Sequence, residues 1–365
     1  MLQLGKFGRS LAPALAVLSL ATAGCRTGVP TGCPVAAREP TPVAAALAEA
    51  AWRQAAQIDS PIDAGREQVA VAGRVASVGW AGLVGAWAEK PVDAWVRAGV
   101  CAQSAVAASV AGRSDDAQTW LSRARTYNAL AGEWRRPLVL RPLLQAEAAQ
   151  VAAGPDASLA WRCGVLAAWM ATNPAERAWV AGYTAVRMAA RTEEPSLPAD
   201  CAQLMMTGAS MGLPYERVDM LILAATVLTA SADRKACLQA LEAVPGARGE
   251  TGSLPAPFYL KVRASQAYAA LGKSSRARRL LREAEEMLFR GATEETAPWA
   301  IYAEGLLANG RADDARQAFL KGLGDAAAKP GFSKRVALSR TMAAMAVSGL
   351  KWTDEEVAAA VKAAE

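Results

Sequence analysis

The chain has 365 residues, of which 53% are hydrophobic, and a formal net charge of +6 at pH 7. It contains no histidine, which excludes histidine-based catalytic triads, histidine zinc ligation and histidine general-base chemistry. The net charge is modest and the basic residues are spread along the chain, so the sequence predicts no nucleic-acid binding. Alanine is abundant and no alternating, strand-like segment stands out, so we predict an all-α fold.

Residues 1–24 have the composition of a secretory signal peptide. Basic residues precede the weakly polar run 11–23, which is shorter than the ~20 residues that a membrane-spanning helix needs. The end of this run, Thr-Ala-Gly-Cys at 22–25, resembles a bacterial lipoprotein signal, in which the thiol of the cysteine, here Cys25, receives a lipid. That family usually has leucine where Thr22 stands, so ordinary signal cleavage before Gly24 stays an alternative.

The segment 25–42 is rich in Thr, Pro and Gly and has no helical periodicity. It is predicted to be a flexible tether with an r.m.s. reach of roughly 20 to 25 Å. In lipoproteins an aspartate after the lipidated cysteine tends to retain the protein at the inner membrane, and Arg26 stands there instead. The resemblance therefore implies an outer-membrane lipid anchor with the folded part facing the periplasm.

From residue 43 to 365, helix-sized apolar patterns separated by turn residues predict antiparallel helix pairs. Ser60 before Pro61 marks one helix start, because serine caps the first-turn amides and proline fits the first helical position. The Gly/Trp-rich segment 79–90 is predicted as a connection, 245–257 as a loop or a hinge, and 353–365 as a polar end cap. The predicted helices are 43–58, 62–78, 92–111, 114–130, 138–152, 157–171, 174–191, 199–211, 215–229, 232–241, 258–271, 274–290, 298–309, 312–320, 333–348 and 353–364.

One residue spacing recurs four times around a helix-breaking turn. In it, glycine supplies a left-handed residue that ends the first helix, and alanine lets the second helix cross closely. The four copies are Ala267, Tyr268, Leu271, Gly272, Ala277, Leu281 and Ala284; Ala107, Ala108, Ala111, Gly112, Ala117, Leu121 and Ala124; Leu306, Gly310, Ala315 and Phe319; and, more weakly, Val227, Ala230, Ser231, Ala236, Ala240 and Ala243. This arrangement resembles the tetratricopeptide repeat, which implies an α-solenoid, a superhelix of stacked helix pairs that binds other molecules.

The resemblance also implies where a partner binds, because the first helix of each tetratricopeptide pair lines a concave groove. The lysine and asparagine that clamp peptide carboxylates in that family are absent here. We predict that the groove binds an apolar helix or extended segment instead. The predicted groove residues are Tyr259, Val262, Arg263, Gln266 and Glu304.

Cysteines and tryptophans leave alternatives open. Cys163, Cys201 and Cys237 are spaced by about one repeat, so they should lie ~10 Å apart on stacked pairs and not form disulfides with one another. A bridge between Cys33 and Cys101 stays open.

Nine of the eleven tryptophans fall between residues 52 and 179. Trp87 with Trp95, and Trp161 with Trp169, fit either a packed core or stacking platforms for a glycan.

No motif predicts catalysis, a cofactor or a metal site. Gly272-Lys273-Ser274 lacks the first glycine of a phosphate-binding loop and follows no predicted strand. We therefore predict a non-enzymatic scaffold or adaptor that binds another cell-envelope protein and contacts the membrane through lipid on Cys25. The alternatives are a glycan- or peptidoglycan-binding lipoprotein that uses the Trp-rich half, and a helical transglycosylase that uses one buried glutamate.

Overall fold

The structure is a computed structural model that describes residues 39–152, 158–171, 174–189, 197–211, 214–244, 247, 257–293 and 295–364. Every regular element in these ranges is helical, which confirms the predicted all-α fold. Cys25 and the rest of the predicted signal peptide lie outside the described residues. The elements are α2 (Pro42–Ala56), α3 (Pro61–Ser77), α4 (Ala81–Trp87), α5 (Ala94–Val110), α6 (Ser114–Leu130), η2 (Arg136–Val139), α7 (Leu140–Ala152), α8 (Leu159–Ala171), α9 (Pro174–Ala189), α10 (Ala199–Ser210), α11 (Pro214–Val227), α12 (Ser231–Glu242), α13 (Phe258–Ala270), α14 (Ser274–Phe289), α15 (Pro298–Ala308), α16 (Ala312–Ala327), α17 (Gly331–Val347) and α18 (Asp354–Ala364).

Local signals place most helix ends close to the predicted positions. The Ser60 hydroxyl accepts a hydrogen bond from the Asp63 amide at 3.4 Å, with Pro61 as the first helical residue. The short helix α4 lies in the segment predicted as a connection, so that prediction was wrong. Its last residue, Trp87, stacks on Trp52 with ring centroids 4.8 Å apart and donates from Nε1 to Glu49 at 2.7 Å. Packing against α2 thus stabilises a helix too short to form alone.

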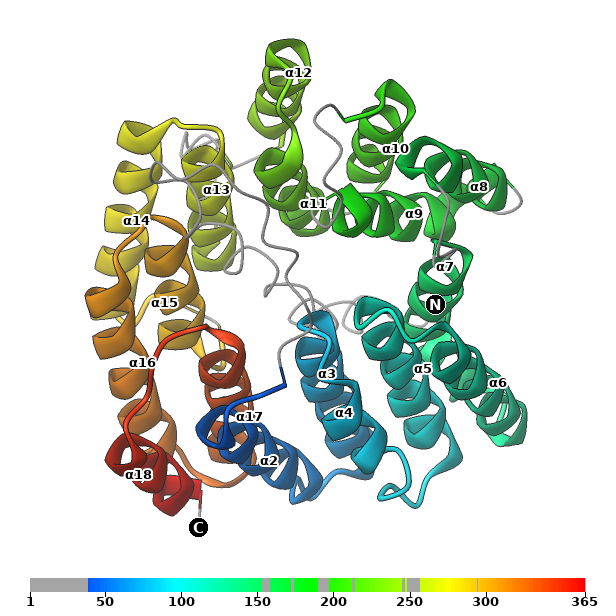
Figure 1. The fold of residues 1–365 in the computed structure, drawn as a ribbon. Helices are drawn as coiled ribbons and strands as arrows, with labels where there is room; N and C mark the ends of the chain where they lie inside the picture. Colours follow the sequence, from blue (N-terminus) through cyan, green and yellow to red (C-terminus); the bar gives the residue numbers. More distant parts are fainter. Residues whose placement is uncertain are drawn as a thin grey trace, which may run out of the picture.

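The helices form a closed ring. The odd-numbered helices α3 to α17 contact one another in chain order, and α17 also contacts α3, so eight helices make an inner circle. The even-numbered helices lie outside them (Figure 1). In sequence, the segment 245–257 lies between α11 and α13. These two inner helices nevertheless pack directly against each other.

The earliest and latest helices of the described ranges close this ring. Helix α2 packs against α17 as well as α3, and so fills the outer position between them. Arg340 on α17 bonds Glu67 on α3, and Arg335 Nη1 donates to Gln57 Oε1 at 2.9 Å. Helix α18 packs on α16 and α2 rather than covering the end of an open stack. The prediction of a polar end cap at 353–365 is therefore corrected, because the stack has no free end there.

The predicted glycine turns are confirmed. Gly112, Gly272 and Gly310 have φ values of 75°, 76° and 76°, in the left-handed region that favours glycine. In each turn the amide of the next residue donates to a carbonyl five residues back, as in Lys273 to Tyr268 at 2.8 Å. The alanine of the crossing helix, such as Ala277, is fully buried. These three copies of the spacing form the same turn and the same crossing.

A second recurring contact is shared by the pairs α9–α10 and α11–α12, which lack this glycine. The Cys201 thiol faces the Ala185 carbonyl at 3.8 Å, and the Cys237 thiol faces the Leu221 carbonyl at 3.7 Å. The two contacts are equivalent, since each cysteine and its acceptor are shifted by the same 36 residues (237 − 201 and 221 − 185). Cys163 is buried like them, and no disulfide joins the three, which confirms that prediction. Cys101 is also a buried thiol, and Cys33 lies outside the described residues.

Candidate functional site

Four of the five predicted groove residues come together inside the ring. Arg263 on α13 is 1% exposed, and its Nε donates to Asp219 Oδ1 on α11 at 2.7 Å. Its Nη1 donates to Gln266 Oε1 at 2.7 Å. Tyr259 donates from its hydroxyl to Asp219 Oδ2 at 2.9 Å. These side chains therefore bond one another instead of standing at the rim of an open groove.

Glu304 on α15 extends the same network to a third and a fourth helix. Its Oε2 lies 3.6 Å from Arg263 Nη1, and its Oε1 accepts a hydrogen bond from Arg74 Nη1 on α3 at 2.6 Å. We call this set the lumen cluster. It consists of Arg74, Asp219, Tyr259, Arg263, Gln266 and Glu304.

Val262, the fifth predicted residue, lies apart from the lumen cluster. It is fully buried in the hydrophobic core between α13 and α15. A Cβ added to Gly305 would come within 2.6 Å of Val262 Cγ1, so the two helices approach closely at this point. Val262 is a packing residue.

Charge in the lumen cluster is balanced. Burial raises the pKa of Asp219, although the neighbouring Arg263 and the Tyr259 hydrogen bond oppose that rise. Burial also raises the pKa of Tyr259 well above its ordinary value, so the phenol stays protonated. For Arg263, burial lowers the pKa, but Asp219, Tyr259 and Glu304 outweigh that effect and hold the guanidinium charged. Two arginines face two carboxylates, which satisfies the buried charges.

Sequence reasoning missed Arg74 and Asp219. Their partners lie on other helices, 230 residues away for Arg74 and 44 for Asp219. A local signal does exist. Each has an apolar or small residue directly before and after it, Arg74 within the predicted helix 62–78 and Asp219 within the predicted helix 215–229, and a charge so placed is a candidate for burial with a distant partner.

Other side chains also fill the interior of the ring. Arg187 on α9 donates to the Ser77 carbonyl at the end of α3, at 3.0 Å, although α9 and α3 are not neighbours around the ring. A side chain thus reaches across the inner circle. The surface that the sequence predicts as a binding groove is occupied by the protein's own contacts at these positions.

The predicted tryptophan pairs differ. Trp87 and Trp95 are both buried and belong to the hydrophobic core. Trp161 on α8 is 55% exposed, whereas Trp169 is partly buried and stacks with Arg177 at 4.8 Å. The first pair cannot serve as a surface platform, because its rings do not reach solvent.

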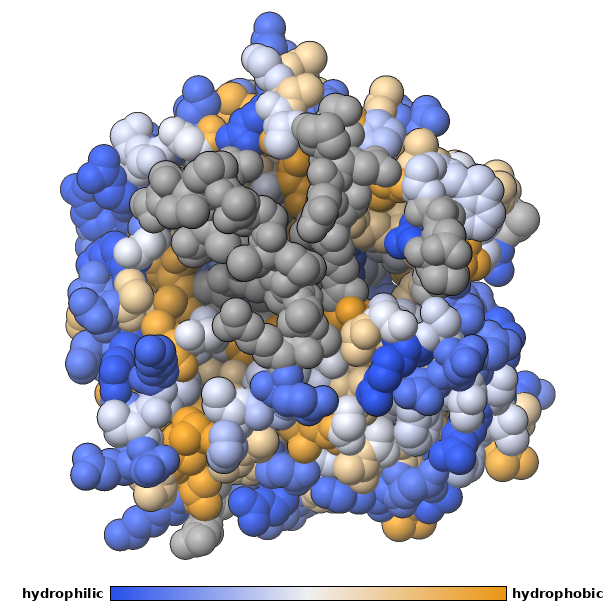
Figure 2. All heavy atoms as spheres, in the orientation of Figure 1, coloured by the Kyte–Doolittle hydropathy of each residue, from blue (hydrophilic) through white to orange (hydrophobic). Residues whose placement is uncertain are grey.

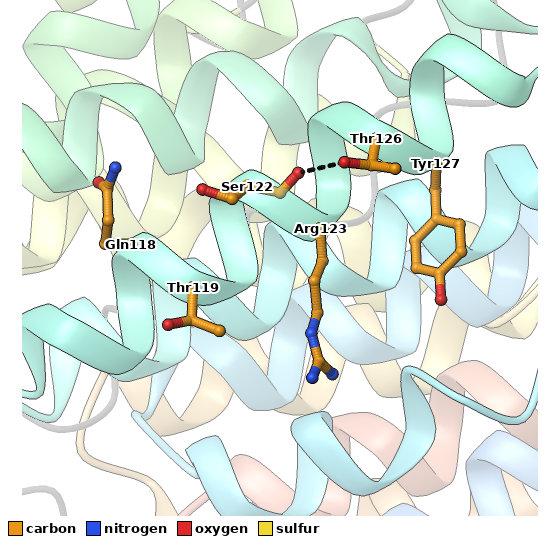
Figure 3. A pocket seen from close by; sticks show the side chains of 6 residues that line it. All are labelled: Gln118, Thr119, Ser122, Arg123, Thr126 and Tyr127. Carbon is orange, nitrogen blue, oxygen red and sulfur yellow. Dashed lines mark hydrogen bonds between the residues drawn. The ribbon is translucent and has the colours of Figure 1, made fainter.

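The outer face of α6 carries a shallow hollow of about 460 Å³. Figure 3 shows its side chains in two rows along the helix, one with Gln118, Ser122 and Thr126 and the other with Thr119, Arg123 and Tyr127. The Thr126 hydroxyl donates to the Ser122 carbonyl at 3.0 Å. The hollow offers hydroxyl, amide and guanidinium groups to a polar ligand.

Exposed apolar side chains gather where α6 is followed by η2 and α7. We call this place the α6–α7 corner, defined by Val92, Leu130, Trp134 and Leu140, all exposed. Trp134 is 61% exposed and lies under the Arg135 guanidinium at 4.6 Å. In Figure 2 the rim over α14 and α16 is mainly hydrophilic.

Hydrogen bonds hold the corner in place. Arg135 Nη1 donates to Asp93 Oδ1 at 2.9 Å, which ties the loop after α6 to the loop before α5. Arg136 donates to the carbonyls of Ala129 and Ala131 at 3.1 and 3.2 Å, at the end of α6. The exposed side chains thus stand on a fixed backbone.

Comparison with protein-family models, curated proteins and solved structures finds no match to this chain. Within the described ranges, no group of three or more Cys, Asp or Glu side chains could hold a metal ion. In the same part of the chain, no helix has the length and apolar composition needed to cross a membrane.

Proposed function

We propose that this protein is a non-catalytic scaffold of the bacterial cell envelope that binds another envelope protein through the α6–α7 corner. The single observation behind this proposal is the exposed, rigidly held apolar cluster there. A monomeric surface rarely gathers large apolar residues without a binding role. The side chains of the lumen cluster bond one another and are not available to a partner. This supports a binding surface on the outside of the ring.

Trp134 has the properties of a binding hot spot. Its indole buries a large area on contact and loses little conformational freedom, since the loop is already ordered by Arg135 and Arg136. The neighbouring Arg135 pairs with Asp93 of the same chain, so this charge does not need a partner protein. The corner therefore suits an apolar helix or extended segment, and its binding should depend little on salt.

A photo-crosslinking residue in place of Leu130 tests this proposal in cells. We expect it to capture one defined envelope protein, and we expect Trp134→Ser in the same chain to reduce that capture at least tenfold. A matched crosslinker in place of the exposed Arg282 on the hydrophilic helix α14 serves as the control. Capture of the same proteins from both positions, or of none from position 130, contradicts the proposed interface.

The proposed membrane attachment is a lipid on Cys25, facing the periplasm from the outer membrane. It is supported by the sequence at 22–25 and by Arg26. Labelled palmitate should enter the wild-type chain and not Cys25→Ser. A Cys25→Ser chain that still takes up the label would show that this residue is not the anchor.

The hollow on α6 favours a second candidate function, binding of a glycan such as a peptidoglycan fragment. Its hydroxyl, amide and guanidinium groups suit sugar hydroxyls, and Arg123 in its lining stacks on Trp120 in the Trp-rich half. Arg123→Ala should then weaken binding of soluble peptidoglycan fragments, measured by calorimetry. Arg125→Ala is the matched control, because Arg125 is exposed on the same helix but does not line the hollow. Equal binding by the two variants, or no binding by the wild type, removes this candidate.

A further inference from the structure

The buried apolar side chains of the ring form two large, separate cores. The first core belongs to α2–α6 and α15–α18, and we call these helices the first arc. The second core belongs to α8–α12, the second arc. Within the described residues, the two cores meet at α7 and at the pair α13–α14 and share no side chain. Figure 1 shows α7 and α13 on opposite sides of the ring, with the second arc between them at the top. Since a domain usually has one contiguous core, each arc is a packing unit of its own.

The shared helices α7 and α13 present different residues to the two cores. On α7, Leu143 belongs to the first core and Leu144 to the second. On α13, Val262 belongs to the first core and Leu260 to the second. Neighbouring residues of an α-helix point about 100° apart, so one helix can pack in both cores at once. The arcs can therefore turn about α7 and α13 while each core keeps its own packing.

Close helix contacts lie inside the arcs. In the first arc, a Cβ added to Gly99 of α5 would come within 2.6 Å of Val69 on α3. In the second arc, a Cβ on Gly208 of α10 would come within 2.8 Å of the Ala178 carbonyl oxygen on α9. The second arc meets α7 through longer side chains, such as Arg141, whose guanidinium lies over the Trp179 ring at 4.8 Å. A long side chain follows a displaced partner by changing its rotamer, so this junction tolerates movement better than the arcs do.

Polar contacts in the lumen connect the two arcs. Arg263 on α13 pairs with Asp219 of the second arc and with Glu304 of the first, at 2.7 and 3.6 Å. Arg187 of the second arc donates to the Ser77 carbonyl of the first at 3.0 Å, and neither residue lies on a shared helix. A rotation about α7 and α13 leaves Arg263 near the axis, where it can keep both partners. The same rotation moves Arg187 away from Ser77.

We propose that the ring is hinged, so that the second arc rotates against the first about an axis through α7 and α13. The hydrogen bond from Arg187 to Ser77 is the latch that holds the two arcs together. Opening breaks this bond and leaves both cores intact, so it is a rigid-body motion of the kind that takes microseconds to milliseconds. This inference does not rest on the proposed partner or on the α6–α7 corner.

Pulsed electron paramagnetic resonance on the full chain in mild detergent tests the hinge. Spin-labelled unnatural amino acids replace the exposed Gln239 on α12 and Gln317 on α16, one in each arc. Arg187→Ala should widen the distribution of distances between these labels about twofold, because the open state becomes populated. Labels in place of Gln203 on α10 and Gln239 lie in one arc, and their distribution should keep its wild-type width. Circular dichroism verifies that the variants fold.

Arg234→Ala is the matched control. Arg234 donates to the Ala270 carbonyl at 2.9 Å, so it also joins an arginine to a carbonyl, but at the end of the shared helix α13 and not across the lumen. This variant should leave the distances between positions 239 and 317 unchanged. An Arg187→Ala distribution as narrow as that of the wild type, or equal widening in both arginine variants, overturns the proposal. Widening between positions 203 and 239 would show local unfolding of the second arc and would also overturn it.

Discussion

The pairs α13–α14 and α9–α10 solve the same packing problem with different residues. The first has the left-handed turn at Gly272 and the fully buried Ala277, so its sequence carries the recurring pattern. The second has neither, and brings its helices together through Gly182 and Gly208, backbone against backbone. Both pairs place one inner and one outer helix in the ring (Figure 1). The comparison teaches that the ring requires its paired helices to approach closely. Alanine permits that approach in one pair and glycine permits it in the other.

The two pairs also differ in the partners of the arginine that each inner helix places inside the ring. Arg263 of α13 pairs with the carboxylates of Asp219 and Glu304, whereas Arg187 of α9 donates a hydrogen bond to the neutral Ser77 carbonyl. Arg263→Ala should therefore lower the free energy of unfolding by about 3–5 kcal/mol, because Asp219 and Glu304 lose a buried counter-charge. Arg187→Ala should cost about 1.5–3 kcal/mol, the value of a hydrogen bond from a charged donor. Denaturant titration measures both.

The control for this prediction is the double variant Arg263→Ala with Asp219→Ala. It should lose less stability than the sum of the single variants, because it removes the charge that the first change leaves alone. Equal losses from Arg263→Ala and Arg187→Ala would mean that the lumen cluster contributes no more than an ordinary hydrogen bond.

Gly208→Ala probes the backbone contact of the second pair. The new Cβ would lie 2.8 Å from the Ala178 carbonyl oxygen, so a helix must move, and we expect a loss of about 1–3 kcal/mol. Gly324→Ala is the matched control, since that site is open, and it should gain about 0.5–1 kcal/mol from helix propensity. Thermal unfolding followed by circular dichroism compares them. A neutral Gly208→Ala would separate the two pairs, because only the first would then depend on close approach.

Gly272→Val probes the turn of the first pair. Its φ of 76° is strained for any residue with a Cβ, so the variant should lose more than about 1 kcal/mol. The space around this glycine is open, which assigns the loss to the backbone and not to a clash. Gly112→Val and Gly310→Val should behave alike, and an unchanged unfolding curve for all three would remove the shared turn as a requirement.

Thiol reactivity offers the mildest probe, because it leaves the fold unchanged. Burial raises the pKa of Cys237 to about 12, and that of Cys101 also to about 12. At pH 8 each native thiol should alkylate more than about a thousandfold more slowly than in denaturant, where thiolates form near pH 8.5. Mass spectrometry reads each site separately. Fast labelling of Cys237 alone would show that the fold opens locally at α12.

Local signals allow the helices to be predicted from the sequence. The bounds of α6, Ser114–Leu130, agree with the prediction because a glycine turn begins the segment and its apolar period is regular. Helix α16 runs to Ala327, beyond the predicted 320, since Gly322 and Gly324 look like a stop although Gly322 is packed against Trp299. A seven-residue helix such as α4 carries too few turns for a period to appear.

The ring and the lumen cluster could not be predicted in this way. Helix α2 meets α17 and Arg74 meets Glu304 at separations of more than 200 residues, and no pattern within one helix records such a partner. Local reasoning gathered Tyr259, Arg263, Gln266 and Glu304 as one site, because they occupy equivalent faces of first helices. It could not show that these side chains face the interior of the ring and bond one another.

Closure of the ring by α2 changes how the fold can fail. An open array of repeats frays from its ends, since a terminal pair has only one neighbour. Here each inner helix has two neighbours, and α2 cannot take its place between α17 and α3 until nearly the whole chain has been made. We expect native-state hydrogen exchange to find no gradient of protection from the ends toward the middle, and α2 and α17 to exchange together. Among the described helices, α2 is thus the earliest in the chain and one of the last to gain its neighbours.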